Sequence, residues 1–305
     1  MTTLSTAPDT TTASAPATVS RGRLVLRRFL RKRLALAGLA VLVLLFAAAY
    51  GLPLVSRWTV TGMDSDYAQS LTGPSPRHWF GTDQIGHDLF VQTMSGLQKS
   101  LLIGLIAALL STTVAALAGA AAGYFGGWSD RIVTAVVDLL LVLPSFLIVA
   151  IISPRLRGGG FLLLALLLAA FNWMITARVV RAMSVALRSR EYVQAAEFMG
   201  VRPWTVIRRH ILPNIASLLI VDATLNVSGT ILAEAGLSYF GLGVQAPNVS
   251  LGTLIAAGTA GPDLNGAPWL WAFPGLLLVA TVLAVNLVGD GLRDALDATS
   301  ASARS

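Results

Sequence analysis

Apolar residues occur along this chain in runs that are long enough to cross a lipid bilayer. Polar or Gly/Pro-rich stretches separate six such runs, which cover about 34–55, 99–123, 132–152, 160–180, 215–235 and 269–288. A run of about 20 apolar residues matches the ~30 Å hydrocarbon core, so each is predicted to be a transmembrane helix. The pattern therefore predicts an all-α polytopic membrane protein with six transmembrane helices. Small residues recur at every fourth position of the second run, from Ala107 to Gly123, and predict a close contact with another helix. Pro144 predicts a kink in the third run.

Composition supports the membrane class and excludes thiol chemistry. Of the 305 residues, 55% are hydrophobic and 12% are charged, whereas soluble domains carry about 25% charged residues. The sequence contains no cysteine, so disulfides, thiolate metal ligands and cysteine nucleophiles are excluded. The net charge of +7 suggests nucleic-acid binding as an alternative, but membrane topology explains the basic excess better.

The basic residues lie mostly on one side of the predicted spans. Six spans place both termini on the same side, and that side holds 17 of the 22 Lys and Arg residues. The positive-inside rule makes this side cytoplasmic. The predicted divisions are a disordered basic cytoplasmic tail (1–33), a first transmembrane helix (34–55), an extracytoplasmic segment (56–98), a core of five transmembrane helices (99–291) and a cytoplasmic tail (292–305).

The first apolar run has a second interpretation, as a signal peptide. Arg27-Arg28-Phe29-Leu30 is similar to a twin-arginine signal, and residues 47–49 are three alanines that would suit a cleavage site. The apolar region of a signal peptide is only about 7–15 residues long. The run over 34–55 is longer, so it is predicted to be an uncleaved anchor.

A polar, arginine-rich island at residues 191–214 interrupts the apolar chain between two spans. Its first half has apolar or small residues at helical spacing, namely Tyr192, Ala195, Ala196 and Met199. Gly200 is predicted to end this helix, because glycine adopts the left-handed C-cap conformation most easily. Pro203 suits the first turn of a second helix, with an apolar face of Trp204, Ile207 and Ile211, closed by Leu212-Pro213. Two short helices with a glycine corner indicate a docking element for a soluble partner.

The spacing of this island resembles the EAA loop of binding-protein-dependent ABC importer permeases. The loop reads Ala195-Ala196, three residues, Gly200, then eleven residues to Leu212-Pro213. The resemblance implies a type I ABC importer permease, in which these coupling helices sit in a cleft of a cytoplasmic ATPase. The residues it assigns to ATPase coupling are Glu191, Tyr192, Gln194, Ala195, Ala196, Glu197, Gly200, Pro203, Leu212 and Pro213. Two positions depart from the motif: Gln194 replaces its glutamate and His210 its isoleucine.

Three further segments resemble the same family in the same order. Residues 78–88 are similar to the HxFGTDxxGRD segment of the C-type dipeptide/oligopeptide permeases, with His87 at the arginine position. Residues 234–243 and 286–297 are similar to two further signatures of the family. The motif residues of the extracytoplasmic segment are Gly81, Thr82, Asp83, Gly86 and Asp88. A metal site formed by the histidines and aspartates of this segment is the alternative; their spacing matches no helical ligand pair, and no metal is predicted.

The chain has no sequence with which to hydrolyse ATP. It lacks a G-x-x-x-x-G-K-[ST] loop, and neither of its two lysines follows a glycine. The chain is therefore predicted to be non-catalytic and to bind no cofactor. The resemblance implies a bacterial inner-membrane complex with a homologous second permease, one or two ATPase subunits that use ATP and Mg, and an extracytoplasmic solute-binding protein. Di- or oligopeptides are the implied substrates, and nickel and glutathione importers share the motifs.

Several polar residues within the predicted spans are candidates for a translocation path: Asp138, Asp222, Asn226, Glu234 and Asn286. A carboxylate at the centre of a span costs about 2.5–3.5 kcal/mol on insertion scales, so it should face the bundle interior or water. Asp222 would either line a wet conduit or only bond a neighbouring helix. An ion-gradient secondary transporter would use the same acids, but no inverted repeat with interrupted helices is evident.

Overall fold

The structure is a computed structural model, which describes residues 21–55, 70–156, 160–260 and 266–302. In chain order the described helices are α1 (Arg21–Phe29), α2 (Arg33–Val55), α3 (Leu89–Phe125), α4 (Gly127–Val142), α5 (Ser145–Ile152), the 3-10 turn η2 (Ser153–Leu156), α6 (Gly160–Asn172), α7 (Met174–Arg188), α8 (Glu191–Phe198), α9 (Pro203–Val206), the π turn η3 (Ile207–Ile211), α10 (Leu212–Tyr239), α11 (Leu251–Thr259) and α12 (Trp269–Ser302). The described residues form no strand. The predicted all-α fold is confirmed.

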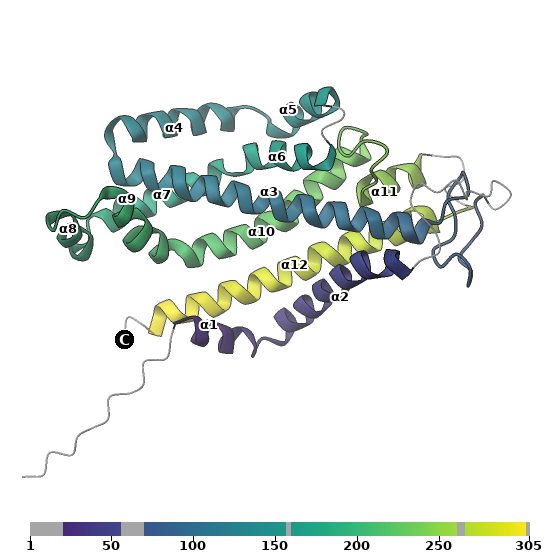
Figure 1. The fold of residues 1–305 in the computed structure, drawn as a ribbon, viewed down its shortest axis with the longest axis horizontal. Helices are drawn as coiled ribbons and strands as arrows, with labels where there is room; N and C mark the ends of the chain where they lie inside the picture. Colours follow the sequence, from purple (N-terminus) through teal and green to yellow (C-terminus); the bar gives the residue numbers. More distant parts are fainter. Residues whose placement is uncertain (1–20, 56–69, 157–159, 261–265, 303–305) are drawn as a thin grey trace, which may run out of the picture.

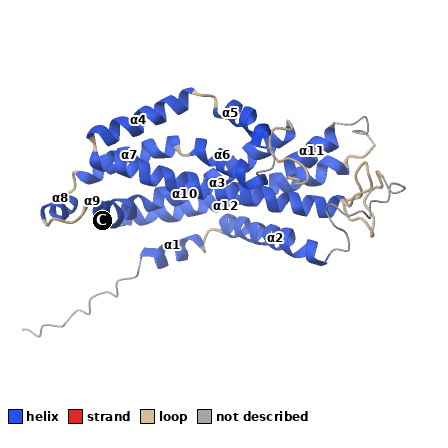
Figure 2. Ribbon diagram, turned by 45° about the horizontal axis from the view of Figure 1, so that its top comes forward, coloured by secondary structure: helices blue, strands red, loops and turns tan. Residues whose placement is uncertain are grey.

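The long helices run side by side along one axis of the molecule (Figure 1). The helices α8 and α9 lie at one end together with α1 and the C-terminal end of α12, and α11 lies at the other end (Figures 1 and 2). We call these the α8 end and the α11 end. Four described helices are long and apolar enough to cross a membrane, and six spans result if each of two bent helix pairs is one span.

The helix α3 is central, because α2, α4, α6, α7 and α10 all pack against it. The predicted stripe of small residues on this helix is buried, and it comprises Ala107, Ser111, Ala115, Gly119 and Gly123. At Gly119 the backbone of α7 is so close that a Cβ atom would lie 2.5 Å from the carbonyl oxygen of Ala177. Small residues therefore allow α3 and α7 to approach each other closely, as the sequence predicts.

Two predicted spans are not straight helices. The third is broken between α4 and α5, where the axes differ by 78°, and the fourth is bent by 44° between α6 and α7. Pro144 follows Leu143, which is in an extended conformation, and the Pro144 carbonyl accepts the first hydrogen bond of α5. Proline removes a donor and disfavours the helical conformation of the residue before it. The predicted proline kink is therefore a complete break.

Three helices do not coincide with the predicted divisions of the chain. Residues 21–29 form the helix α1, although disorder was predicted to residue 33; α1 packs on α12 through Phe29. The second span begins at Leu89 rather than near 99, because Asp88 caps it. The helix α12 continues to Ser302, through most of the predicted C-terminal tail. The prediction for residues 1–20 lies outside the described residues.

Candidate functional site

The helices α8 and α9 form a compact element that covers the ends of α3, α7 and α10. Its buried side chains are Val193, Ala196, Val206, Ile207 and Ile211, and they share one apolar cluster with Ala120, Tyr124, Val180 and Ile215. The packed face of α8 is thus formed by Val193 and Ala196. The predicted stripe divides differently: Ala196 is buried, whereas Tyr192, Ala195 and Met199 are exposed. Three of the four residues at the predicted helical spacing therefore lie on the exposed face of α8.

The corner between the two helices is fixed by backbone geometry. Gly200 has φ of +74°. Its N–H donates to the Glu197 carbonyl at 2.9 Å, and the Val201 N–H donates to the Ala196 carbonyl at 3.1 Å. This pair of hydrogen bonds is the Schellman motif, which requires a left-handed residue at the glycine position. The predicted glycine C-cap is confirmed.

The second helix begins at Pro203, as predicted, but Leu212-Pro213 does not end it. The Leu212 N–H donates to the carbonyl of Ile207, five residues back, which is a π turn. A π turn shifts the hydrogen-bond register by one residue, and Asn214 donates its side-chain amide to the His210 carbonyl at 2.6 Å. These bonds accommodate the proline, whose missing N–H would otherwise disrupt the helix. The helix therefore continues from Pro203 to Tyr239.

The remaining polar residues of the element divide between its two faces. Glu191 and Gln194 are exposed. Glu197 is half-buried and hydrogen-bonds the Tyr124 hydroxyl, and the Arg188 guanidinium lies 5.7 Å from the centre of the Tyr124 ring. Glu197 therefore ties α8 to the end of α3, while Glu191 and Gln194 are accessible at the surface.

The most exposed large apolar side chain of the element is one that the sequence reasoning missed. Phe198 is 90% exposed, although it lies in the last turn of α8. Trp204, predicted to share an apolar face with Ile207 and Ile211, is instead 56% exposed and packs edge-on against Phe125. Phe198 lies one position before Met199 of the predicted stripe. A large aromatic residue just outside the apolar stripe of a short helix was the sequence signal for an exposed contact residue.

A cavity of about 430 Å³ lies between α7, α10 and α12 and contains Asp222. The Thr176 hydroxyl lies 2.9 Å from both carboxylate oxygens, and the Asn226 side-chain amide donates to one of them at 2.9 Å. Arg293 and Asp297 of α12 also line the cavity. Gly229, on the same stripe of α10, faces open space. The structure thus joins Asp222 and Asn226, and it adds Thr176, which the sequence pattern did not indicate.

The other predicted path residues lie apart from this cavity. Glu234 is completely buried; it accepts hydrogen bonds from Ser100 at 2.8 Å and Ser238 at 2.6 Å. Its carboxyl joins α3 to α10 inside the packing and does not line the Asp222 cavity. Asn286 accepts from Ser228 at 2.8 Å and links α10 to α12. Asp138 forms an ion pair with Arg178, which joins α4 to α7, and both side chains are about half-exposed.

The motif at residues 81–88 folds into a cap on α3. Asp88 accepts from the Val91 N–H at 3.0 Å and lies 2.8 Å from Nδ1 of buried His78. Asp83 accepts from the backbone N–H of His87 at 2.8 Å and from the side chain of Gln92 at 2.9 Å. An aspartate that accepts a first-turn N–H is a typical N-cap.

The glycines and the threonine of this motif close the cap. Gly81 and Gly86 have positive φ, and a Cβ on Gly81 would lie 2.6 Å from the Thr72 carbonyl oxygen. The Thr82 hydroxyl accepts from the Thr72 N–H at 2.9 Å. No group of three or more His, Asp or Glu side chains in the described part of the chain is arranged to hold a metal ion. In this structure the motif residues hold the loop before α3 in its conformation and cap that helix.

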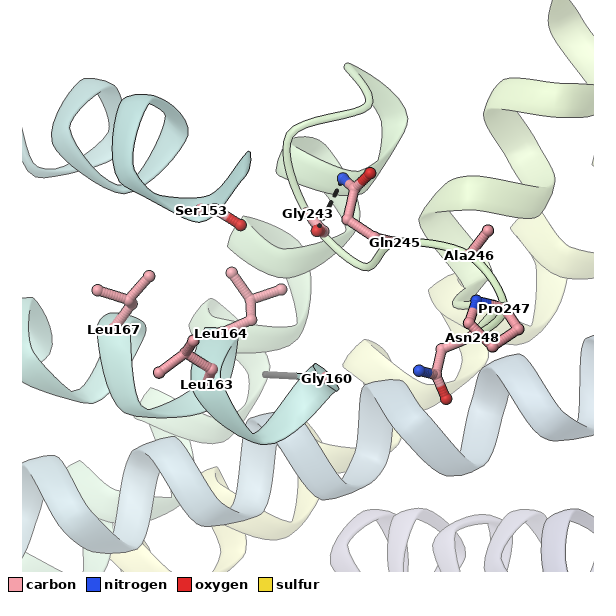
Figure 3. A pocket seen from close by; sticks show the side chains of 10 residues that line it. All are labelled: Ser153, Gly160, Leu163, Leu164, Leu167, Gly243, Gln245, Ala246, Pro247 and Asn248. Carbon is pink, nitrogen blue, oxygen red and sulfur yellow. Dashed lines mark hydrogen bonds between the residues drawn. The ribbon is translucent and has the colours of Figure 1, made fainter. Parts of the chain in front are cut away.

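A smaller pocket, of about 120 Å³, lies at the α11 end (Figure 3). Leu163, Leu164 and Leu167 of α6 form one wall, and the loop over 243–248 forms the other. Gln245 donates to the Gly243 carbonyl at 3.2 Å and stabilises this loop. The lining offers no charged side chain, so the pocket is part of the packing between α6 and the loop.

The bundle of long apolar helices, with a projecting helical element at one end, is the architecture of a multi-pass membrane protein. The chain belongs to the family of binding-protein-dependent transport system inner membrane components, which matches residues 100–300. Residues 20–74 match the N-terminal transmembrane domain of oligopeptide transport permease C. The resemblance drawn from the motifs is confirmed, and the chain is a permease subunit of an ABC importer.

Relatives of this chain cover nearly its whole length. It is 52% identical over 286 residues to the oligopeptide transport system permease protein OppC of Mycobacterium tuberculosis, which covers 93% of this chain and 97% of the relative. It is 40% identical to a putative peptide permease protein of Brucella suis, over 88% of each chain. It is 37% identical to the oligopeptide transport system permease protein OppC of Bacillus subtilis, over 88% of this chain and 87% of the relative.

Proposed function

We propose that this chain imports di- and oligopeptides as one of two permease subunits, and that separate ATPase subunits dock on α8 and α9. The observation that carries the docking proposal is the outward surface of this element. Phe198, Met199 and Trp204 are 90, 76 and 56% exposed. They belong to α8, to the corner after it and to α9, the helices at the α8 end of the molecule (Figure 1). Large exposed apolar side chains that lie together mark a protein interaction surface.

The inward face makes this surface suitable for transmitting force. Val193, Ala196 and Ile207 are almost fully buried against the ends of α3 and α7. A partner that moves Phe198 therefore also moves these helix ends, because packed cores resist continuous deformation. ATP and Mg are bound by the ATPase subunits in this scheme.

The orientation proposed from the base count agrees with the position of the docking element. The chain's basic residues are concentrated in α1, in the second half of α7 and in 190–209, all of which lie at or toward the α8 end. We place that end and both termini in the cytoplasm. The α11 end, with the cap over 81–88, then faces the solute-binding protein.

The cavity around Asp222 is the proposed part of the translocation path. Its carboxylate accepts hydrogen bonds from Thr176 and Asn226 inside the cavity, and a Cβ atom at the neighbouring Gly229 would meet nothing within 4 Å. A carboxylate at this depth requires water or a protein partner. We infer that the second permease closes this face and leaves an aqueous conduit that tolerates zwitterionic peptides. Asp138 and Asn286 lie on neighbouring helices and are secondary candidates.

The peptide substrate is supported by the relatives that carry that name, and uptake measurements test it. A strain that lacks the gene is complemented with it, and uptake of a labelled tripeptide, of nickel and of glutathione is compared. We expect restored uptake of the tripeptide alone, lost when the Walker-A lysine of the ATPase is replaced. Restored uptake of nickel alone or of glutathione alone would show that this compound, and not a peptide, is the substrate. Tripeptide uptake that survives ATPase inactivation would indicate secondary transport.

Cross-linking tests the docking surface directly, because the native chain has no cysteine. We expect Met199→Cys to form a cross-link with an ATPase subunit in native membranes. The control is Trp79→Cys, which is similarly exposed at the α11 end. Failure of Met199→Cys and Phe198→Cys to cross-link in a complex that still transports would overturn the docking proposal.

A further inference from the structure

Two opposite charges line one cavity without pairing with each other. The cavity of about 430 Å³ between α7, α10 and α12 is lined by Asp222 of α10 and by Arg293 of α12. In the described part of the chain Asp222 accepts hydrogen bonds from the neutral side chains of Thr176 and Asn226. Asp222 is partly exposed and Arg293 is exposed, so both charges are accessible to a ligand in the cavity.

The packing of α10 on α12 places these two charges at similar depth. A Cβ atom on Gly289 of α12 would lie 3.3 Å from the side chain of Thr224 of α10. The two helices are antiparallel, because α10 begins and α12 ends at the α8 end (Figure 1). At 1.5 Å per residue, Asp222 lies about 3 Å and Arg293 about 6 Å from that contact, both toward the α8 end. The difference in depth is smaller than the length of an arginine side chain.

The guanidinium of Arg293 remains available for a further carboxylate. Its ion pair in the described structure joins Nε to Asp297 at 3.9 Å, and the two side chains are 64 and 77% exposed. Such an exposed pair contributes little to stability, and 3.9 Å is too long for a hydrogen bond. Arg293 can therefore bind the carboxylate of a ligand without losing a hydrogen bond to Asp297.

We propose, on the basis of the import function above, that this cavity holds a short peptide by its two ends, with the N-terminal ammonium at Asp222 and the C-terminal carboxylate at Arg293. A cation would be attracted by Asp222 and repelled by Arg293, and an anion the reverse, whereas a zwitterion complements both. An ammonium donates up to three hydrogen bonds, and a guanidinium binds a carboxylate through two. An extended peptide spans at most about 3.3–3.6 Å per residue. Two or three residues thus have a length comparable with the spacing of about 8–10 Å between neighbouring helices.

The test measures protection of a cysteine in the cavity of the assembled importer, purified in nanodiscs without the binding protein. Val179 lines the cavity and is 40% exposed, and the chain has no cysteine of its own. Mass spectrometry follows alkylation of Val179→Cys by a maleimide. We expect trialanine to slow alkylation. Its C-terminal amide and its N-acetyl form should each need about tenfold higher concentrations, as for loss of one charge-assisted hydrogen bond.

Two further substitutions in the Val179→Cys chain assign each end of the peptide to its residue. In Arg293→Gln trialanine should protect no better than its amide, while its advantage of about tenfold over the N-acetyl form remains. Asp222→Asn should show the converse. Arg131→Gln removes a charge from an exposed position of α4 outside the cavity, and it should retain both differences. If Asp222→Asn fails to assemble, the exposed Arg293 still decides the outcome.

Several results would overturn the site: no protection by trialanine, equal protection by all three peptides, or no alkylation of Val179→Cys. A difference between trialanine and its amide that persists in Arg293→Gln would also overturn it. Tripeptide uptake by the complemented strain tests import separately. Normal uptake together with any of these results would reject the site alone, whereas a lack of uptake with the unmodified chain would reject the proposed function.

Discussion

The corner at Gly200 allows backbone strain to be separated from lost contacts. Its φ is +74°, and a Cβ atom there would meet nothing within 4 Å. Substitution therefore removes no packing and adds only conformational strain. A left-handed conformation costs an L-residue about 1–2 kcal/mol. Among the substituents, asparagine tolerates the left-handed conformation best. For β-branched valine this conformation is a genuine outlier, and we expect it to cost Gly200→Val about 2–3 kcal/mol.

This strain should appear as weaker docking of the ATPase. A free-energy change of about 2 kcal/mol shifts a local equilibrium roughly 30-fold, so in Gly200→Val the Schellman corner opens and Phe198 is no longer fixed. We expect co-purification of the ATPase and peptide uptake to decrease in the order Gly, Asn, Ala, Val. The amount of permease in the membrane should remain at the parental level.

Gly160 supplies the matched control for this series. It also has a positive φ, of +64°, with nothing within 4 Å of a Cβ position, but it begins α6 far from α8. Gly160→Val should introduce similar strain and leave ATPase association unchanged. Parental uptake and association in Gly200→Val would refute the reasoning, and so would an equal loss of association in Gly160→Val.

Three further results are expected. An impermeant thiol reagent should label Pro76→Cys in intact cells and should not label Arg202→Cys; the reverse pattern would invert the topology. Asp222→Asn should assemble and retain ATPase activity but transport poorly, whereas normal uptake would remove the carboxylate from the path. Glu234→Ala should destabilise the purified permease by about 2–4 kcal/mol in thermal unfolding, from lost hydrogen bonds and a cavity. Glu234→Gln should destabilise it less, and equal stability of both variants with the parent would contradict the clamp between α3 and α10.

Periodicity and turn chemistry predicted the parts of the fold that depend on local sequence. The runs of apolar residues predicted the all-α architecture, and the small-residue stripe predicted the packed face of α3. The glycine corner at Gly200 and the helix start at Pro203 depend on backbone conformations that few residues adopt easily. Such positions can be recognised from sequence because the constraint lies in the residue itself.

The errors came from interactions between elements. Pro213 reads as a helix end, but a π turn and the side chain of Asn214 accommodate it. Helical spacing of apolar residues does not decide which face of α8 is buried, because burial depends on the helices that α8 packs against. Val193 is buried there, whereas Tyr192 and Met199 are exposed. Glu234 and Asp222 both lie in the fifth predicted span, and their sequence positions do not distinguish them. In the structure Ser100 and Ser238 donate hydrogen bonds to Glu234 inside the packing, whereas Asp222 lies in a cavity.

The continuous helix from Pro203 to Tyr239 has a mechanical consequence. Its 37 residues correspond to a rod of roughly 55 Å. The proposed docking surface lies at one tip. At the other tip Gly241, with φ of +73°, donates to the Ser238 carbonyl and ends the helix. Its one irregular turn lies next to the docking surface, so the remaining length has no joint at which a displacement would be absorbed. A tilt imposed at Trp204 would therefore be carried along the helix to its far tip, where Glu234 is bonded to α3. If the ATPase docks at Trp204 as proposed, its movement would reach the opposite face of the molecule through a single rigid rod.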